Sequence, residues 1–166
     1  MQTKISGRVW KYGDDVNTDV IFPGKYTYSI SDPQEMAQHA LEDLDPGFVQ
    51  HVQPGDIIVA GKNWGCGSSR EQAVTCLKQA GVGAIVARSF ARIYFRNCIN
   101  QALPIVVCDA VDGVETGQEI TIDFAAGTVT TPGGVYSFPP LAPEVIGILE
   151  AGGLIPYVRQ QLGVEA

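Results

Sequence analysis

Residues 56–107 alternate short apolar runs with segments of helical periodicity, and this alternation constrains the fold more than any other feature. Three apolar runs are typical of buried strands: 56–60, 84–87 and 103–107. Apolar residues recur at helical spacing over 69–80 and 89–101, and Gly81 is a natural C-cap for the first of these segments. The order strand, helix, strand, helix, strand predicts parallel strands with right-handed crossovers and a ligand site beyond their carboxyl ends.

The flanking segments predict further strands and helices around this core. Short strands are expected at 5–12 and 19–22, a hairpin at 119–124 and 127–131, and helices at 33–44 and 143–151. No repeat, linker or block of like charge divides the chain. We therefore predict one α/β domain over residues 1–166, in which antiparallel strands are added to a parallel β-α-β-α-β core.

Composition narrows the class of protein. An apolar fraction of 45% in 166 residues is enough for one hydrophobic core. No apolar stretch approaches the roughly 20 residues that span a bilayer, and the first residues lack the apolar segment of a signal peptide. The formal charge of -7 disfavours binding to a phosphate backbone. These observations predict a soluble, cytoplasmic protein with neither a membrane nor a nucleic acid as its partner.

The four cysteines do not form a metal motif. Cys66, Cys76, Cys98 and Cys108 are separated by 10, 22 and 10 positions, and no Cys-x-x-Cys pair occurs. We expect free thiols and no metal bound by this chain. The last three cysteines lie in apolar runs, where a thiol acts as a small apolar side chain.

The loop 61–71 lies where a predicted strand ends and a predicted helix begins, which is where α/β folds bind ligands. Its three glycines allow tight turns, and the start of the following helix offers unpaired N–H groups to an anion. Arg70 can hold a carboxylate with both arms of its guanidinium, and the Ser69 hydroxyl adds another donor at the same place. Ser68 and Glu71 also have the spacing of a capping box, so helix capping is the competing interpretation of Ser68.

Other ligand classes fit this loop poorly. It lacks the G-x-x-x-x-G-K-S/T pattern of a phosphate-binding loop, and its glycine spacing differs from that of a dinucleotide fingerprint. Neither of the two histidines lies in a motif that places a base beside Ser68, so a serine hydrolase is unsupported. A carboxylate pocket is the interpretation that these residues favour.

The run GKNWGCGSSREQA at 61–73, together with 88–93, Asn97 and 103–104, closely resembles the small subunits of the aconitase superfamily, of the isopropylmalate dehydratase and homoaconitase type. Further matches extend the resemblance over nearly the whole chain: 7–10, 13–21, 54–56 and 149–154. The resemblance implies a swivelling α/β domain whose partner, a separate large subunit, holds a 4Fe–4S cluster. It also implies a lyase that moves a hydroxyl between adjacent carbons by dehydration and rehydration, with an active site between the two subunits.

The resemblance assigns roles to residues of the loop. Carried over by position, Ser68 corresponds to the serine that takes a proton from the substrate carbon, acting as an alkoxide. Ser69 and Arg70 correspond to contacts with a substrate carboxylate. Three further residues correspond to supporting positions around the site: Arg92, Asn97 and Asp19. The chain departs from the family at Gln72, where relatives frequently carry His, so no proton transfer is expected at that position.

Residues 23–31 correspond to the loop that contacts the variable group of the substrate, and these contacts are expected from Lys25, Tyr26 and Tyr28. Relatives that accept an additional carboxylate often carry Arg where this chain has Tyr28, whose aromatic face suits an alkyl group. We therefore expect isopropylmalate as the substrate, in leucine biosynthesis. The alternatives are a homoaconitase-type or 2,3-dimethylmalate dehydratase subunit and, from another class, a non-catalytic carboxylate-binding module. A homo-oligomer of the isolated chain also stays open.

Overall fold

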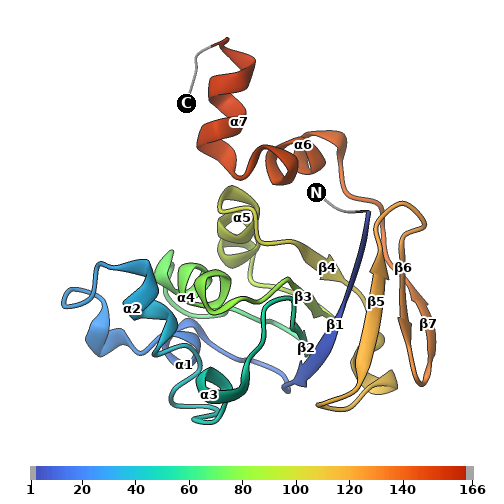
Figure 1. Cartoon of the computed structure of the whole chain (residues 1–166), viewed down its shortest axis with the longest axis horizontal. Helices are drawn as coiled ribbons and strands as arrows, with labels where there is room; N and C mark the ends of the chain where they lie inside the picture. Colours follow the sequence, from blue (N-terminus) through green and yellow to red (C-terminus); the bar gives the residue numbers. More distant parts are fainter. Residues whose placement is uncertain (1–2, 164–166) are drawn as a thin grey trace.

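The computed structural model describes residues 3–163, which form one curled sheet with helices packed on it (Figure 1). Its strands hydrogen-bond in the order β4-β3-β2-β1-β5-β6-β7. The strands are β1 (Lys4–Lys11), β2 (Ile57–Ala60), β3 (Ala84–Ala87), β4 (Ile105–Val107), β5 (Glu119–Asp123), β6 (Thr128–Thr131) and β7 (Gly134–Ser137). The α-helices are α1 (Thr18–Ile21), α2 (Pro33–Ala37), α3 (Phe48–His51), α4 (Gln72–Ala80), α5 (Arg92–Asn100), α6 (Pro143–Ala151) and α7 (Leu154–Gln161). Two 3-10 helices, η1 (Gly24–Tyr26) and η2 (Ala110–Gly113), lie in the connections.

Strands β1 to β4 form the parallel half of the sheet, which confirms the predicted core. Ile58 of β2 pairs with Ile85 of β3, and Ile85 pairs with Ile105 of β4. Every residue of β2 and β3 is buried, because both faces of these strands are covered. Ile58 belongs to the apolar cluster beneath α4 and α5, whereas Ile57 and Val59 belong to the cluster beneath β5 and β6. Alternate side chains of β2 therefore face opposite sides of the sheet and pack in two different apolar clusters.

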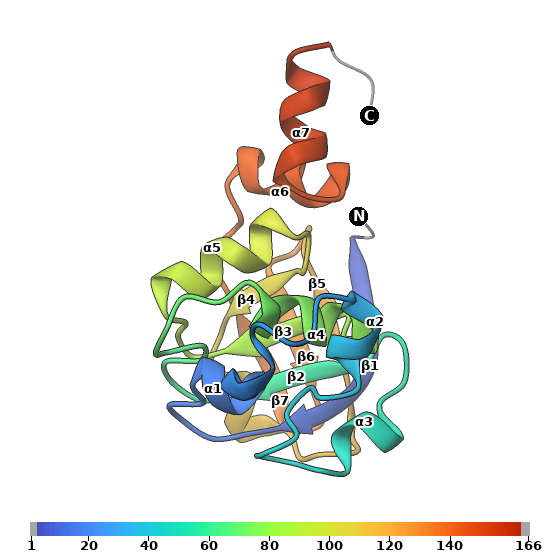
Figure 2. The ribbon, with the colours of Figure 1, turned by 90° about the vertical axis from the view of Figure 1, so that its left-hand side faces the viewer.

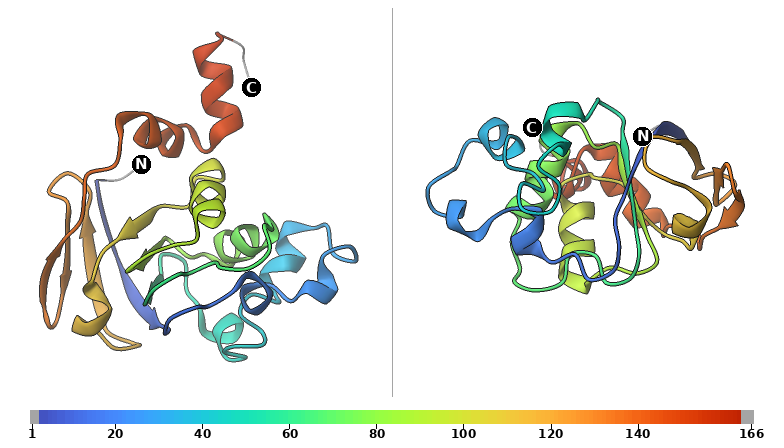
Figure 3. Two further views of the ribbon diagram at one scale, coloured as in Figure 1. Left: turned by 180° about the vertical axis from the view of Figure 1, so that it is seen from behind. Right: turned by 90° about the horizontal axis from the view of Figure 1, so that it is seen from below.

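Strands β5, β6 and β7 continue the sheet beyond β1, each antiparallel to the strand before it in the sheet, and curl over its second face (Figure 3). The predicted hairpin is confirmed by β5 and β6, in which Ile122 lies opposite Val129. The curl brings the ends of the sheet close together, since the Cys108 thiol after β4 lies 3.7 Å from the Ser137 carbonyl oxygen of β7. The strand β7 was not predicted, because its residues are half-buried or exposed and carry no clear apolar alternation.

The predicted strand at 19–22 is wrong, because Thr18–Ile21 forms the helix α1. Asn17 is its N-cap, and the Asn17 side-chain oxygen accepts a hydrogen bond of 2.9 Å from the backbone N–H of Val20. Ile21 and Phe22 are fully buried beneath the helices of the same face. Packing and capping thus override the strand preference of this apolar run.

The predicted helix at 33–44 is correct only for its first part, because α2 ends at Ala37 and turns follow it. Leu41 has a φ of 56°, which interrupts a right-handed helix. The Leu41 N–H instead donates a hydrogen bond of 2.8 Å to the carbonyl oxygen of Ile21. A contact between segments far apart in sequence therefore replaces the next helical bond.

The other predicted helices are present, and two of them begin later than predicted. The helix α6 has the predicted bounds and ends at Gly152 in a left-handed conformation. The helices α4 and α5 begin at Gln72 and Arg92, each three residues later than predicted. The helix α7, which was not predicted, stands away from the sheet and buries none of its residues (Figure 1). Within residues 3–163, every helix is too short or too polar to cross a bilayer.

Candidate active site

The loop 61–71 connects β2 with α4 and lies on the side of the molecule that carries α1, α4 and α5 (Figure 2). Its first residues are fixed by a carboxylate from the segment after β1. The Asp14 Oδ1 atom accepts a hydrogen bond of 2.7 Å from the N–H of Lys62. A β-carbon at Gly61 would lie 1.8 Å from this oxygen, so any other residue would displace the carboxylate. The predicted position of the loop at the carboxyl end of a buried strand is confirmed.

The middle of the loop packs against the buried side chain of Tyr94. Gly65 has a φ of 82°, and a β-carbon on it would lie 2.2 Å from Cγ of Tyr94. The Tyr94 hydroxyl donates a hydrogen bond of 2.9 Å to the carbonyl oxygen of Ala73 in α4. Burial raises the pKa of Tyr94 well above its usual value, so this phenol stays protonated and supports the loop. Tyr94 lies within the predicted helical segment 89–101, whose periodicity alone does not indicate this role.

The helix α1 holds the loop from the other side. The N–H of Thr18 donates to the carbonyl oxygen of Cys66 at 2.9 Å, and the Thr18 hydroxyl donates to that of Ser68 at 2.8 Å. The N–H of Gly65 donates to the carbonyl oxygen of Val16 at 2.8 Å. Three hydrogen bonds therefore join residues 65–68 to residues 16–18, about 50 positions earlier in the sequence.

Ser68 and Ser69 are exposed, and their hydroxyls have no hydrogen-bond partner within residues 3–163. The capping-box interpretation of Ser68 is wrong, since α4 begins at Gln72 after Glu71, and no side chain caps it. Across the part of the chain that the structure describes, the backbone N–H groups of residues 67–72 also lack an acceptor. A row of unpaired donors thus runs beside two free hydroxyls, which is an arrangement that stabilises negative charge.

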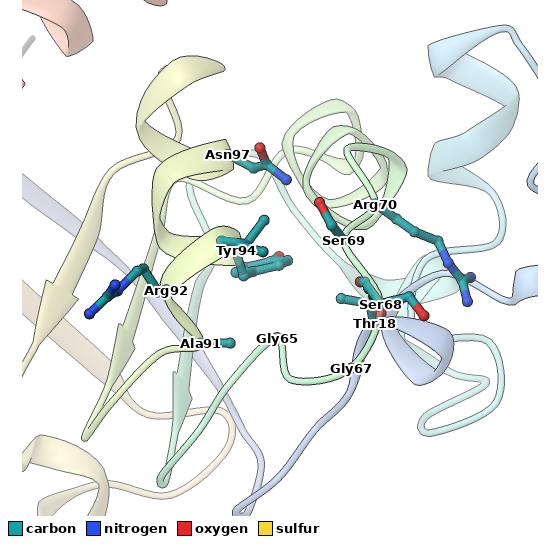
Figure 4. Close-up of a pocket in the computed structure, with 11 residues that line it drawn as sticks. Thr18, Gly65, Gly67, Ser68, Ser69, Arg70, Ala91, Arg92, Tyr94 and Asn97 are labelled. Carbon is teal, nitrogen blue, oxygen red and sulfur yellow. Dashed lines mark hydrogen bonds between the residues drawn. The ribbon is translucent and has the colours of Figure 1, made fainter.

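A cavity of about 270 Å³ opens beside these serines (Figure 4). Its walls come from α1, the loop and the first two turns of α5: Thr18, Gly65, Gly67, Ser68, Ser69, Arg70, Ala91, Arg92, Ile93, Tyr94 and Asn97. Pockets for drug-sized ligands measure roughly 300–1,000 Å³, so this cavity suits a small organic acid. Ser69 lies across the cavity from Asn97, whereas the Arg92 side chain points away from it (Figure 4).

The Arg70 guanidinium does not point to the same place as the Ser69 hydroxyl, contrary to the prediction from sequence. It forms an ion pair with Asp19 of α1 and lies 3.4 Å from the carbonyl oxygen of Phe22. The Arg70 side chain is only 15% exposed, while the Asp19 side chain is 62% exposed. Gly24 packs against the pair, because a β-carbon there would lie 2.7 Å from Asp19 Oδ1. Asp19 therefore contacts Arg70 directly and fixes its guanidinium on the outer side of the loop.

The three residues expected from loop 23–31 do not line the cavity. Tyr26 packs on the His39 ring with 4.1 Å between ring centroids, and its hydroxyl lies 3.4 Å from Glu42. The Lys25 ammonium lies 5.1 Å from the centre of the Tyr26 ring. Tyr28 is fully exposed. Tyr26 thus anchors the loop to the segment after α2, and only Lys25 and Tyr28 are free to contact a ligand.

The described residues contain no group of three or more His, Cys, Asp or Glu side chains that fits a metal ion. All four cysteines are free thiols, as expected. Cys76, Cys98 and Cys108 are buried, and burial raises the pKa of each thiol, so these groups stay neutral. The residues of this part of the chain therefore do not fit an iron–sulfur cluster.

Comparison with known proteins agrees with this fold and loop. Residues 18–109 match the sequence model of the aconitase C-terminal domain. The chain is 49% identical to the 3-isopropylmalate dehydratase small subunit of Caldicellulosiruptor bescii, over 96% of this chain and 98% of that protein. It is 46% identical to small subunit 2 of the same enzyme from Archaeoglobus fulgidus, over 95% and 96% of the two chains. The crystal structure of 3-isopropylmalate dehydratase from Methanocaldococcus jannaschii superposes with a TM-score of 0.90 at 40% identity, over 96% of this chain and 95% of the other.

The fold and the serine-rich loop define an aconitase-type swivel domain, with the predicted parallel core and added antiparallel strands. The match extends over nearly the full length of the chain and of its relatives. The chain belongs to the family of 3-isopropylmalate dehydratase small subunits, within the aconitase superfamily.

Proposed function

We propose that this chain is the small subunit of a heteromeric hydro-lyase that interconverts 2- and 3-isopropylmalate in leucine biosynthesis. The observation that carries the proposal is Ser68, whose hydroxyl is free and exposed beside a row of unpaired backbone donors. The membership of the family and the small size of the cavity both support a small hydroxy acid as the substrate.

In this proposal Ser68 takes the proton from the substrate carbon and later returns it. A serine hydroxyl is a very weak acid, so its alkoxide requires nearby donors and a site closed to water. The N–H groups of residues 67–72 supply donors, and the hydrogen bond from Thr18 to the Ser68 carbonyl oxygen fixes the backbone. Ser68 is exposed in the isolated chain, so a second surface is needed to exclude water.

The proposed carboxylate contacts are Ser69 and Arg70. The Ser69 hydroxyl lies on the cavity wall across from Asn97, so it is placed to donate to a bound acid (Figure 4). The guanidinium of Arg70 uses one nitrogen on Asp19 and lies beside Gly24, at the start of loop 23–31. A substrate carboxylate that reaches this side of the loop would meet the remaining donors of Arg70.

The second surface is the large subunit of the enzyme, which we propose as the holder of the 4Fe–4S cluster. Such a cluster supplies a Lewis acid for the leaving hydroxyl, and the residues described in this chain provide no ligand set for one. The chain's own contribution is the serine, the donors around it and the carboxylate contacts. We therefore expect one domain, residues 1–166, that is active only in the complex.

The test is Ser68→Ala in the complex, measured as anaerobic turnover of isopropylmalate with the partner's cluster intact. General acid–base groups contribute about 10²- to 10⁴-fold, so kcat should fall by that factor while assembly with the large subunit is unchanged. The matched control is Ser137→Ala, an exposed serine on β7, which should leave kcat unchanged. Turnover at the native rate in Ser68→Ala would overturn the role of this serine.

The other candidate, a non-catalytic carboxylate-binding module, is distinguished by the isolated chain. A module of that kind binds isopropylmalate without any partner, as measured by calorimetry. The enzyme subunit should bind it weakly or not at all when alone, because Ser68 and Ser69 then lie open to water. Tight binding by the isolated chain, together with no turnover in the complex, would favour the module.

A further inference from the structure

The exposed face of α5 carries two arginines for which residues 3–163 provide no partner. Arg92 and Arg96 lie one helical turn apart, Ile93 lies three residues before Arg96, and all three side chains are exposed. Within residues 3–163, neither guanidinium has an ion pair or a side-chain hydrogen bond. This is unusual in a chain with a formal charge of -7, where carboxylates outnumber arginines and lysines by 18 to 11.

The position of Arg92 is also unfavourable for the helix itself. Arg92 is the first residue of α5, and the first turn contains no acidic residue. The N-terminal end of a helix carries partial positive charge, so a cation there is destabilising and an acidic residue is favoured. Ala91, the N-cap, provides no side-chain hydrogen bond to offset this cost. Neither the cap nor the first turn of α5 therefore offsets this cost, which favours a stabilising contact from outside the chain.

The same face borders the cavity that needs a second surface. Arg92 and Ile93 lie on the rim of this cavity, and Arg96 continues the face by one turn. Arg92 points away from Ser68 and Ser69 (Figure 4), and Arg96 does not line the cavity. A substrate held beside the serines is thus poorly placed to meet these two guanidinium groups, whereas a protein that covers the cavity meets them directly.

We propose that Arg92, Ile93 and Arg96 form the docking surface for the large subunit, and that they pair with carboxylates and an apolar contact on that partner. The inference rests on the proposed function, because it takes the second surface to be that subunit. Arginine is favoured in such contacts, since its planar guanidinium binds carboxylates with two parallel hydrogen bonds and is weakly hydrated. Exposed Ile93 supplies the apolar centre that such contacts need.

The test is the affinity of the two subunits, measured by anaerobic titration of the native full-length small subunit or its variants into the cluster-loaded large subunit. The double charge reversal Arg92→Glu plus Arg96→Glu should raise Kd about 10- to 100-fold. The matched control is Arg159→Glu on α7, an exposed arginine away from the cavity, which should leave Kd unchanged. The Kd of the native subunits should rise as the salt concentration increases through about 0.1 M, where the Debye length is near 10 Å. The Kd of the double variant should change less with salt.

Turnover separates docking from a role in substrate binding. Arg96→Glu alone, at a position that does not line the cavity, should regain the native kcat and KM once the large subunit is in sufficient excess, because only assembly is weakened. An unchanged Kd in the double variant would overturn the proposal, and so would a raised KM for isopropylmalate in Arg96→Glu that persists at saturating large subunit. Thermal unfolding of the double variant checks that it is folded. A glutamate at the start of α5 is favourable, so the melting temperature should not fall. The Ser68→Ala variant assembles normally under this scheme, so loss of docking and loss of catalysis are measured independently.

Discussion

The Thr18 hydroxyl donates a hydrogen bond of 2.8 Å to the carbonyl oxygen of Ser68, across 50 positions of sequence. Thr18 is 2% exposed, so the bond is shielded from water on the side of α1. The helix α1 thereby determines where the backbone of the candidate catalytic serine lies. The side chain of Ser68 remains free because the contact uses its carbonyl oxygen.

Replacement of Thr18 with Val should remove this bond and leave the Ser68 carbonyl without its donor. We expect a loss of about 1–2 kcal/mol in the free energy of unfolding, and a lower kcat in the complex because the loop is less firmly held. Urea unfolding of the small subunit and turnover of the complex check the two effects. Thr18→Ser keeps the hydroxyl and should retain most of the activity; equal losses in Val and Ser variants would contradict the role of the bond.

Replacement of Gly65 with Ala should destabilise the fold for two reasons. The φ of 82° costs about 1–2 kcal/mol for a residue with a β-carbon, and that carbon would lie 2.2 Å from Cγ of Tyr94. With the displacement of a buried ring added, we expect about 3 kcal/mol or more in urea unfolding. Gly117→Ala is the matched control, since its φ is 93° but no atom lies within 4 Å. A Gly65 effect no larger than the Gly117 effect would contradict the contact with Tyr94.

The pKa of Glu42 lies below its usual value, chiefly because of the hydrogen bond with His39, whose Nδ1 atom is 3.0 Å from the carboxylate. A carboxylate whose pKa is lower in the folded state than in the unfolded state stabilises the fold. This contribution is fully present above the unfolded pKa of about 4.3 and disappears as the pH falls through the folded pKa. Glu42→Gln should therefore flatten the acid side of the stability profile. Urea midpoints from about pH 6 to pH 3 check this. Glu35→Gln on α2, an exposed carboxylate, serves as the control and should leave the profile as it is.

Replacement of Tyr28 with Arg should shift substrate preference toward tricarboxylates. Tyr28 is fully exposed, so the change should leave the fold intact. A guanidinium can bind an additional carboxylate with two parallel hydrogen bonds, whereas a phenol can donate only one. We expect the ratio of kcat/KM for homocitrate to that for isopropylmalate to rise about tenfold or more. Tyr28→Gln, which adds no charge, is the control. An unchanged ratio in the Arg variant would contradict a role of loop 23–31 in substrate selection.

The parallel core and the position of the loop follow from the sequence, because apolar runs and helical stripes are local patterns. The predicted runs at 56–60, 84–87 and 103–107 each contain a strand of the parallel core: β2, β3 and β4. The motif around Ser68 is by itself sufficient to indicate the family. The strand predicted at 19–22 and the end of the helix predicted at 33–44 fail where distant segments meet, as when the Leu41 N–H bonds to the Ile21 carbonyl oxygen.

The sequence by itself determined the fold class, the family and the loop that carries the two serines, since spacing and residue type are sufficient for these. Only the tertiary structure decided which neighbours those residues have. It joined Arg70 to Asp19, laid Gly65 on Tyr94, turned Arg92 outward and left Tyr28 in solvent. The physical reason is that a side chain's direction and partners depend on backbone segments brought together by folding, and these contacts leave no periodic pattern in the sequence.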